Sequence, residues 1–183
     1  MLRLFFALQP ALEQSRALVE KTMPLAAWLR AGPVPPENVH ATLCFVGACP
    51  EDRLDGLLAV ASSVRGAAAT LHFNVYEYWR KAQVLCATAA EDARGAAYAL
   101  AHEICERATA VGFTPDIKPF RPHLTLARKA DPTLVASLDW PQPLEPGFVV
   151  RCEEFVLMES RRGERGSIYS VVKSWPLYAE GGS

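Results

Sequence analysis

The chain has 183 residues, of which 50% are hydrophobic and 21% are charged, so it can bury the core of one full domain or of two closely packed lobes. Its 19 basic and 20 acidic residues give a net charge of −1, which argues against a protein that coats a long stretch of nucleic-acid backbone. A nucleic-acid substrate would therefore be bound at an end or over a few nucleotides.

Helical and strand patterns alternate over the first part of the chain. The apolar start at residues 2–8 predicts a buried strand rather than a signal peptide, because no small-residue cleavage site follows it. The further predicted strands cover residues 39–46, 70–79 and 83–89. The predicted helices cover residues 10–29, 51–65 and 91–111.

The last third of the chain is predicted to contain mainly strands. One strand begins at His123, and two others cover residues 148–158 and 167–173. Residues 131–147 contain four prolines and are predicted to form a loop. No run approaches the roughly 18 apolar residues that a membrane span needs, so no membrane partner is expected.

The five cysteines form no Cys-x-x-Cys pair, and most of them fall in apolar segments. In such segments a free cysteine behaves as a small buried hydrophobe. We therefore expect free thiols, and a reducing, cytoplasmic location suits them best.

One order of elements occurs twice: a strand, a long helix, and a strand that carries His-x-Thr-Leu. The first copy contains His40 and Thr42, and the second contains His123 and Thr125. Because side chains of a strand alternate between two faces, the histidine and threonine of each copy are expected on the same face. Two such units related by a pseudo-twofold axis would bring the two motifs face to face.

Two imidazoles on opposite sides of a phosphorus atom can act as general base and general acid, since their ordinary pKa of about 6.5 lies near working pH. The threonine hydroxyls can donate hydrogen bonds to the phosphate oxygens. Ordinary strand composition would explain one His-x-Thr, but two copies at equivalent places favour a site. Neither motif holds an acidic residue, and so a metal site is not indicated.

These motifs resemble the paired signatures of the two-histidine phosphoesterase superfamily. The segments NVHATLCFVG at 38–47 and RPHLTLAR at 121–128 are most similar to the RNA 2′,3′-cyclic phosphodiesterases, historically called 2′-5′ RNA ligases. The resemblance extends over almost the whole chain. It implies an α+β fold of one bilobal domain over residues 1–183, with two antiparallel sheets around a central cleft and helices outside.

The resemblance also implies the chemistry and the site. The expected reaction is metal-independent, cofactor-free hydrolysis of a 2′,3′-cyclic phosphate at an RNA 3′ end to a 2′-phosphomonoester, carried out by a monomer. His40, Thr42, His123 and Thr125 take the catalytic positions, with His123 favoured as the base and His40 as the acid. Arg128 matches a basic residue that contacts phosphate in the family.

Some features of the sequence extend this prediction without deciding it. Three aromatic residues are candidates to stack a base: Phe45, Trp79 and Tyr169. A late basic cluster is either a phosphate site or solvated surface: Arg161, Arg162 and Arg165.

Other functions stay open at this point. The same site run in reverse would be a 2′-5′ RNA ligase, which we expect only as a side activity. A non-catalytic module that binds RNA ends is less favoured, because docking alone would favour arginine or lysine over histidine. The substrate could also be a small cyclic nucleotide or a 2′-5′ oligoadenylate.

Overall fold

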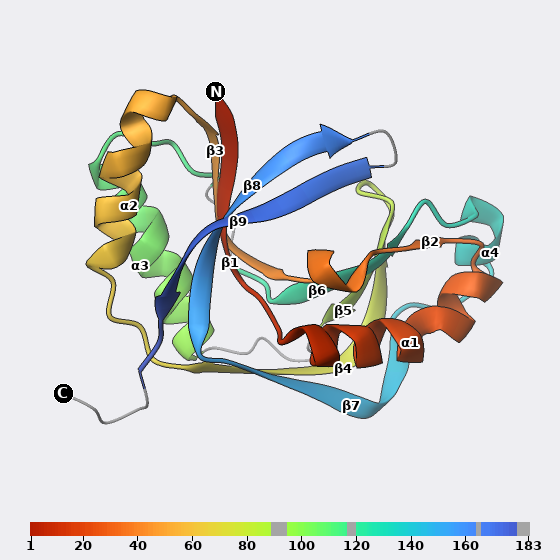
Figure 1. Ribbon diagram of the computed structural model, residues 1–183. Helices are drawn as coiled ribbons and strands as arrows, with labels where there is room; N and C mark the ends of the chain where they lie inside the picture. Colours follow the sequence, from red (N-terminus) through yellow and green to blue (C-terminus); the bar gives the residue numbers. More distant parts are fainter. Residues whose placement is uncertain (89–94, 117–119, 164–165, 179–183) are drawn as a thin grey trace.

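Two antiparallel sheets form the centre of the computed structural model, which describes residues 1–88, 95–116, 120–163 and 166–178 (Figure 1). The four-stranded sheet has the order β3 (Ala41–Cys49), β1 (Leu2–Leu8), β8 (Glu154–Gly163), β9 (Gly166–Pro176). The five-stranded sheet has the order β2 (Gly32–Pro33), β6 (His123–Arg128), β5 (Val84–Thr88), β4 (Ala69–Trp79), β7 (Gln142–Cys152). The predicted α+β fold with two antiparallel sheets is confirmed.

Helices lie on the outer sides of both sheets (Figure 1). The α-helices are α1 (Leu12–Trp28), α2 (Leu54–Ser62), α3 (Ala96–Ala110) and α4 (Pro132–Ala136). Two short 3-10 helices are η1 (Pro36–Asn38) and η2 (Glu51–Arg53). The predicted helices at 10–29 and 51–65 are thus present with shorter bounds, and the first part of the predicted helix at 91–111 lies outside the described residues.

The two repeated units are β1–α1–β3 and β5–α3–β6, and in each unit the two strands pair with one another. The helix of each unit, however, packs on the sheet of the other unit. Helix α1 contacts β2 and β6 of the five-stranded sheet, and α3 mainly contacts β3 of the four-stranded sheet, with a smaller contact to β4 of the five-stranded sheet. The two sheets are therefore connected by the repeated units themselves.

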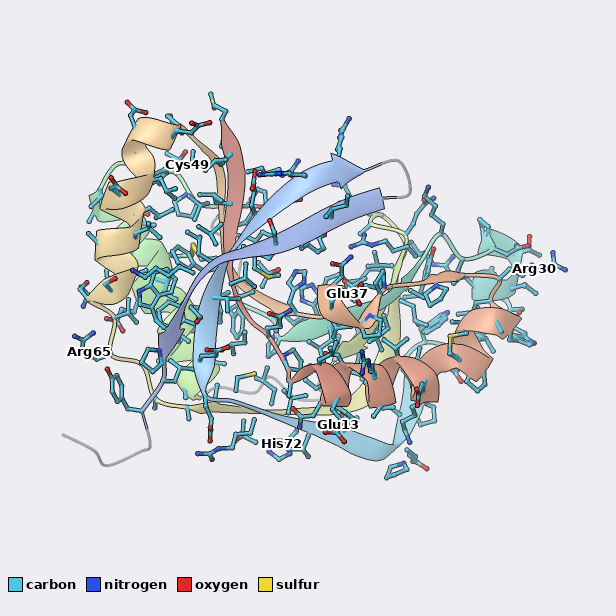
Figure 2. All side chains as sticks on the ribbon, viewed as in Figure 1. Glu13, Arg30, Glu37, Cys49, Arg65 and His72 are labelled. Carbon is cyan, nitrogen blue, oxygen red and sulfur yellow. A yellow bond between two sulfur atoms is a disulfide. The ribbon has the colours of Figure 1, made fainter. Side chains whose placement is uncertain are left out.

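Strand β1 is buried on both faces, which explains its continuous apolar sequence. Leu4, Phe6 and Leu8 belong to the main core, and Figure 2 shows side chains filling the space between α2, α3 and the four-stranded sheet. The opposite face of the sheet carries a second, small apolar cluster. Its buried members are Phe5, Ala7, Val156 and Met158, with Phe45 and Tyr169 packed against them.

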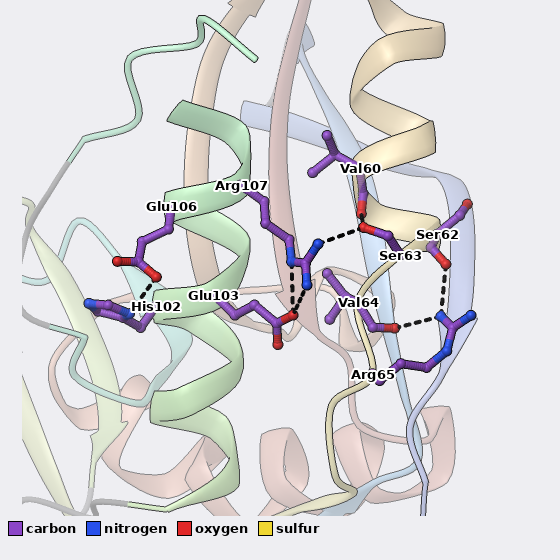
Figure 3. A network of polar contacts seen from close by, with 9 residues as sticks. All are labelled: Val60, Ser62, Ser63, Val64, Arg65, His102, Glu103, Glu106 and Arg107. Carbon is purple, nitrogen blue, oxygen red and sulfur yellow. Dashed lines mark hydrogen bonds and ion pairs between the residues drawn. The ribbon is translucent and has the colours of Figure 1, made fainter. Parts of the chain in front are cut away.

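Polar contacts hold α2 against α3 at their outer surface (Figure 3). The Nη1 of Arg107 donates to the hydroxyl of Ser63 at 2.9 Å, and the Nε of Arg107 donates to Glu103 at 2.8 Å. In addition, Cys44 of β3 and Cys105 of α3 form a disulfide with Cα atoms 5.7 Å apart. Helix α3 is thus linked both to the end of α2 and to β3.

The disulfide corrects one expectation, since two of the five cysteines are not free thiols. The other three are free and buried, as expected: Cys49, Cys86 and Cys152. The predicted cytoplasmic location stays a prediction. Among the described residues, no helix is long and apolar enough to cross a membrane.

The predicted loop at 131–147 is wrong, because its prolines occupy positions that regular structure tolerates. Pro132 is the first residue of α4, where no backbone N–H is needed, and the Asp131 carboxylate caps the helix by accepting from the N–H of Thr133 at 2.9 Å. Pro143 and Pro146 lie in β7, an edge strand.

The predicted strand at 148–158 is in fact the end of one strand and the start of another. β7 ends at Cys152 in the five-stranded sheet, and β8 begins at Glu154 in the four-stranded sheet. The chain therefore changes sheets at Glu153. The predicted strand at 39–46 also ends too early, since β3 continues to Cys49 with Gly47 at a φ of +84°.

Candidate functional site

A cleft of about 400 Å³ lies where the two sheets meet, and β3 contacts β6 there. It contains both motifs and three of the four residues predicted to contact substrate, all but Trp79: His40, Thr42, His123, Thr125, Arg128, Phe45 and Tyr169. A larger cavity of about 570 Å³ near the start of α1 contains none of these residues. The fold therefore brings the two motifs together in one cleft, as their sequence predicts.

The two histidines are held in the same way. The Nδ1 of His40 lies 2.7 Å from the carbonyl oxygen of Asn38, and the Nδ1 of His123 lies 2.8 Å from that of Arg121. Because a carbonyl oxygen can only accept, each Nδ1 carries the hydrogen and donates it. In the neutral ring Nε2 then has the free lone pair, so each histidine can take up a proton at Nε2 and give it back.

A β-bulge in each motif changes which side chains share the cleft face. Leu43 has no partner on β1, and Leu126 has no partner on β5. In both strands the residue after this leucine is buried as well, so the regular alternation is interrupted.

The bulges explain how Arg128 reaches the cleft. It lies five residues after His123, and an odd offset in a regular strand would direct its side chain to the opposite face. The extra residue at Leu126 restores the cleft-facing direction, so Arg128 is exposed in the cleft. Phe45 has the same offset from His40 and lies in the cleft for the same reason.

His40 lies against an apolar wall formed by the second cluster. Its ring centre is 4.9 Å from that of Phe5 and 5.0 Å from that of Tyr169, which meets it edge-on. Burial there lowers the pKa of His40 from 6.5 to about 4, although the carbonyl of Asn38 acts in the opposite direction. The nearby positive charges of His123 and Arg128 lower this pKa further, as expected for groups that face each other across one cleft.

His123 has a more polar surrounding. Its ring centre lies 4.4 Å from that of Trp79, whose indole N–H donates to Glu77 at 2.8 Å, and Arg121 also pairs with Glu77. Burial lowers the pKa of His123, and the charge of Arg121 lowers this pKa too. The hydrogen bond to the backbone carbonyl of Arg121 and the charge of Glu77 raise it. Trp79 supports His123 and does not line the cleft, so it is not brought together with the other predicted stacking residues.

The thiol of Cys86 lies 3.8 Å from the hydroxyl of Thr125, on the neighbouring strand β5. Burial raises the pKa of Cys86 to about 12, and so the group remains a neutral thiol that can hydrogen bond but not act as a nucleophile. At the equivalent place in the other motif, Ala7 pairs with Thr42. The two halves of the site therefore differ beside their threonines.

The remaining histidines lie away from the cleft. His72 is exposed on β4 (Figure 2), and His102 pairs with Glu106 on α3 at 3.2 Å (Figure 3). Across the described residues, no group of three or more histidine, cysteine, aspartate or glutamate residues is arranged to hold a metal ion.

The cleft also contains residues that were not predicted for it. Arg3 and Phe5 come from β1, and Ser160, Arg162 and Ser167 come from β8 and β9. Arg162 had a signal in the sequence as part of a basic cluster, whose third member, Arg165, lies outside the described residues. The strand alternation of β8 could have divided this cluster between two faces, but which face lines a cleft depends on the tertiary fold.

Known proteins are similar to this chain over nearly its full length. A protein of Thermus thermophilus named RNA 2′,3′-cyclic phosphodiesterase is 30% identical over 202 residues, covering 99% of this chain and 93% of the relative. An Escherichia coli K12 protein of the same name is 26% identical and covers 96% of each chain. The crystal structure of E. coli LigT complexed with 3′-AMP superposes with a TM-score of 0.82 at 25% identity, covering 96% of this chain and 98% of that one.

The family model described as "LigT like Phosphoesterase" matches residues 7–85 and 88–169, which include both motifs and most of the two sheets. The chain belongs to the LigT-like phosphoesterase family.

Proposed function

We propose that this protein hydrolyses the 2′,3′-cyclic phosphate at an RNA 3′ end to a 2′-phosphomonoester by acid–base catalysis. One observation carries the proposal: two histidines, each donating from Nδ1 to the carbonyl two residues before it, present equivalent Nε2 atoms to one cleft together with two threonines and an arginine. The names of the Thermus and E. coli relatives support the substrate class.

In the proposed reaction the cyclic phosphate lies between the two histidines. Neutral His123 takes a proton from water through Nε2, and the water oxygen attacks phosphorus. The bond from phosphorus to O3′ breaks while protonated His40 donates its proton to O3′. The products are a 2′-phosphate and a free 3′-hydroxyl, so one water is consumed and each histidine ends in the other's starting protonation state.

The low pKa of His40 fits the acid role once substrate is bound. In the empty cleft His40 is neutral at pH 7, because its pKa lies at about 4. A phosphate anion next to the ring favours the imidazolium form and raises this pKa. His40 would then gain its proton together with the substrate, so that the acid is charged only when a phosphate is present.

Charge that develops on the non-bridging phosphate oxygens would be stabilised by the hydroxyls of Thr42 and Thr125 and by Arg128. Their cleft-facing positions, which for Arg128 depend on the bulge at Leu126, support these roles. Because both histidines donate from Nδ1 to a carbonyl and can exchange a proton at Nε2, they can exchange roles, which would account for a 2′-5′ ligase side activity.

The test uses RNA oligonucleotides ending in a 2′,3′-cyclic phosphate, with the released phosphomonoester identified by ³¹P NMR. Wild type should produce the 2′-phosphate, and His40→Ala and His123→Ala should each lower kcat by roughly 10²-fold or more. His72→Ala, which removes an imidazole outside the cleft, should keep wild-type turnover. Tight binding of the cyclic end without turnover would refute the proposal in favour of a module that only binds RNA ends.

A further inference from the structure

The cleft contains more positive charge than one phosphate requires. Its lining includes Arg3, Arg128 and Arg162 and no aspartate or glutamate. The side chains of Arg128 and Arg162 make no ion pair or hydrogen bond with any described residue, and the side chain of Arg3 only lies over the ring of Phe45, 5.0 Å from its centre. Three like charges around a small cleft repel one another, and bound anions relieve that repulsion.

Strand β8 places its two neighbouring arginines on opposite faces of the sheet. Val156 and Met158 belong to the cluster on the cleft side of the sheet, and Ser160 and Arg162 continue the same face into the cleft. Arg161 is on the other face, where its guanidinium donates to the Glu159 carboxylate at 2.7 Å. Arg161 is thus neutralised within the protein, whereas its neighbour Arg162 is left for a ligand.

The unpaired arginines come from both sheets. Arg128 extends from β6, the strand of His123 and Thr125, and is assigned above to the phosphate that reacts. Arg3 and Arg162 extend from β1 and β8 of the four-stranded sheet. A cyclic phosphodiester has a single negative charge, so Arg3 and Arg162 have no partner in a nucleoside 2′,3′-cyclic phosphate.

We propose that Arg3 and Arg162 form a second phosphate subsite, which binds the phosphate on the 5′ side of the terminal nucleoside. This inference rests on the proposed function and narrows its substrate class. The 5′ position is the only other place where a terminal nucleotide bears a phosphate. That phosphate is either the phosphodiester linking the preceding nucleotide or a 5′-monophosphate, and both present anionic oxygens that a guanidinium binds in a bidentate manner.

The first experiment measures binding and does not depend on turnover. Calorimetry compares adenosine 2′-phosphate with adenosine 2′,5′-bisphosphate, which differ only in the 5′-phosphate. Wild type should bind the bisphosphate more tightly by about tenfold, as expected for charge-assisted hydrogen bonds to one phosphate. Arg3→Gln and Arg162→Gln should each reduce this ratio, and the double variant should bring it close to one.

Arg161→Gln is the matched control, because it removes one arginine from the same strand but from the opposite face. Glutamine can still donate to Glu159, and thermal unfolding checks that every variant is folded. In Arg161→Gln, the ratio of the affinities for the bisphosphate and the monophosphate should equal that of wild type.

A dinucleotide bearing a 2′-phosphate tests whether the subsite binds a linking phosphodiester or a 5′-monophosphate. If the dinucleotide and the bisphosphate gain equally in affinity over adenosine 2′-phosphate, either phosphate occupies the subsite.

A kinetic arm compares the kcat/KM of adenosine 2′,3′-cyclic phosphate with that of the dinucleotide ending in it. The ratio should favour the dinucleotide in wild type and fall in Arg162→Gln. For each lost phosphate contact, the slope of log Kd of the dinucleotide against log salt should drop by about 0.7. Equal binding of mono- and bisphosphate by wild type, or an unchanged ratio in the double variant, overturns the subsite. Loss of turnover on every substrate with the binding ratio intact overturns only the proposed function.

Discussion

The burial of His40 predicts that the protein loses stability as the pH falls toward 5. The folded protein holds this imidazole neutral down to a pKa of about 4, whereas the ordinary value is 6.5. Between these values the unfolded chain binds a proton that the folded protein does not, so the free energy of unfolding decreases with decreasing pH. The free energy of unfolding is therefore not reduced by His40 above pH 6.5, and it decreases progressively below that pH.

The magnitude follows from the two pKa values. A shift from 6.5 to about 4 corresponds to about 2 kcal/mol of lost stability at pH 5 relative to pH 8, and to about 3 kcal/mol below pH 4. The physical source is the contact of the ring with Phe5 and Tyr169, which removes water that would solvate the imidazolium.

The assay is urea unfolding at pH 8 and pH 5, followed by tryptophan fluorescence in buffers without phosphate. Wild type should lose about 2 kcal/mol more than His40→Asn between these pH values, because carboxylates and His123 titrate in both proteins and cancel in the comparison. His72→Asn should behave as wild type, since that imidazole is exposed. Equal losses in wild type and His40→Asn would refute the idea that the cleft keeps His40 neutral.

Three other results should follow from the same geometry. Because burial lowers the pKa of both histidines, kcat/KM should peak below pH 6.5, while kcat, measured with the phosphate anion bound, should peak at a higher pH; a shared optimum above pH 7 would contradict this. Thr42→Val and Thr125→Val should each lower kcat/KM by a factor equivalent to about 1–4 kcal/mol. Arg128→Ala should raise KM and weaken the dependence of KM on salt. An unchanged KM in Arg128→Ala would exclude a contact between Arg128 and the phosphate. Activity should survive EDTA treatment and dialysis, and recovery only on addition of a divalent ion would show that the reaction needs a metal.

The pairing of the two motifs could be predicted because it depends on local periodicity and on a repeated order of elements. His40 and Thr42 share a face because they are two residues apart, and the same holds for His123 and Thr125. The position of Arg128 could not be derived in this way. Its direction depends on a bulge at Leu126, and a bulge is defined only relative to the partner strand.

Other parts of the fold depend on position within a sheet, which local sequence does not contain. The prolines of residues 131–147 predicted a loop. In the structure Pro143 and Pro146 lie in strand β7, which tolerates them because it is an edge strand. Likewise, Arg161 and Arg162 look alike in sequence. One pairs with Glu159 and the other lines the cleft, because the face of β8 that meets the cleft is decided by how the two sheets come together.

The exchange of helices between the two repeated units has a consequence for how the molecule can be divided. Each unit places its strands in one sheet and its helix on the other, as two protomers do in a domain-swapped dimer, but within a single chain. A cut between the two motifs, for example in the turn at 80–83, would divide both sheets between the fragments and would separate α3 from β3, the strand on which it mainly packs. Neither fragment should fold by itself, and mixing the two should restore structure and cleft together.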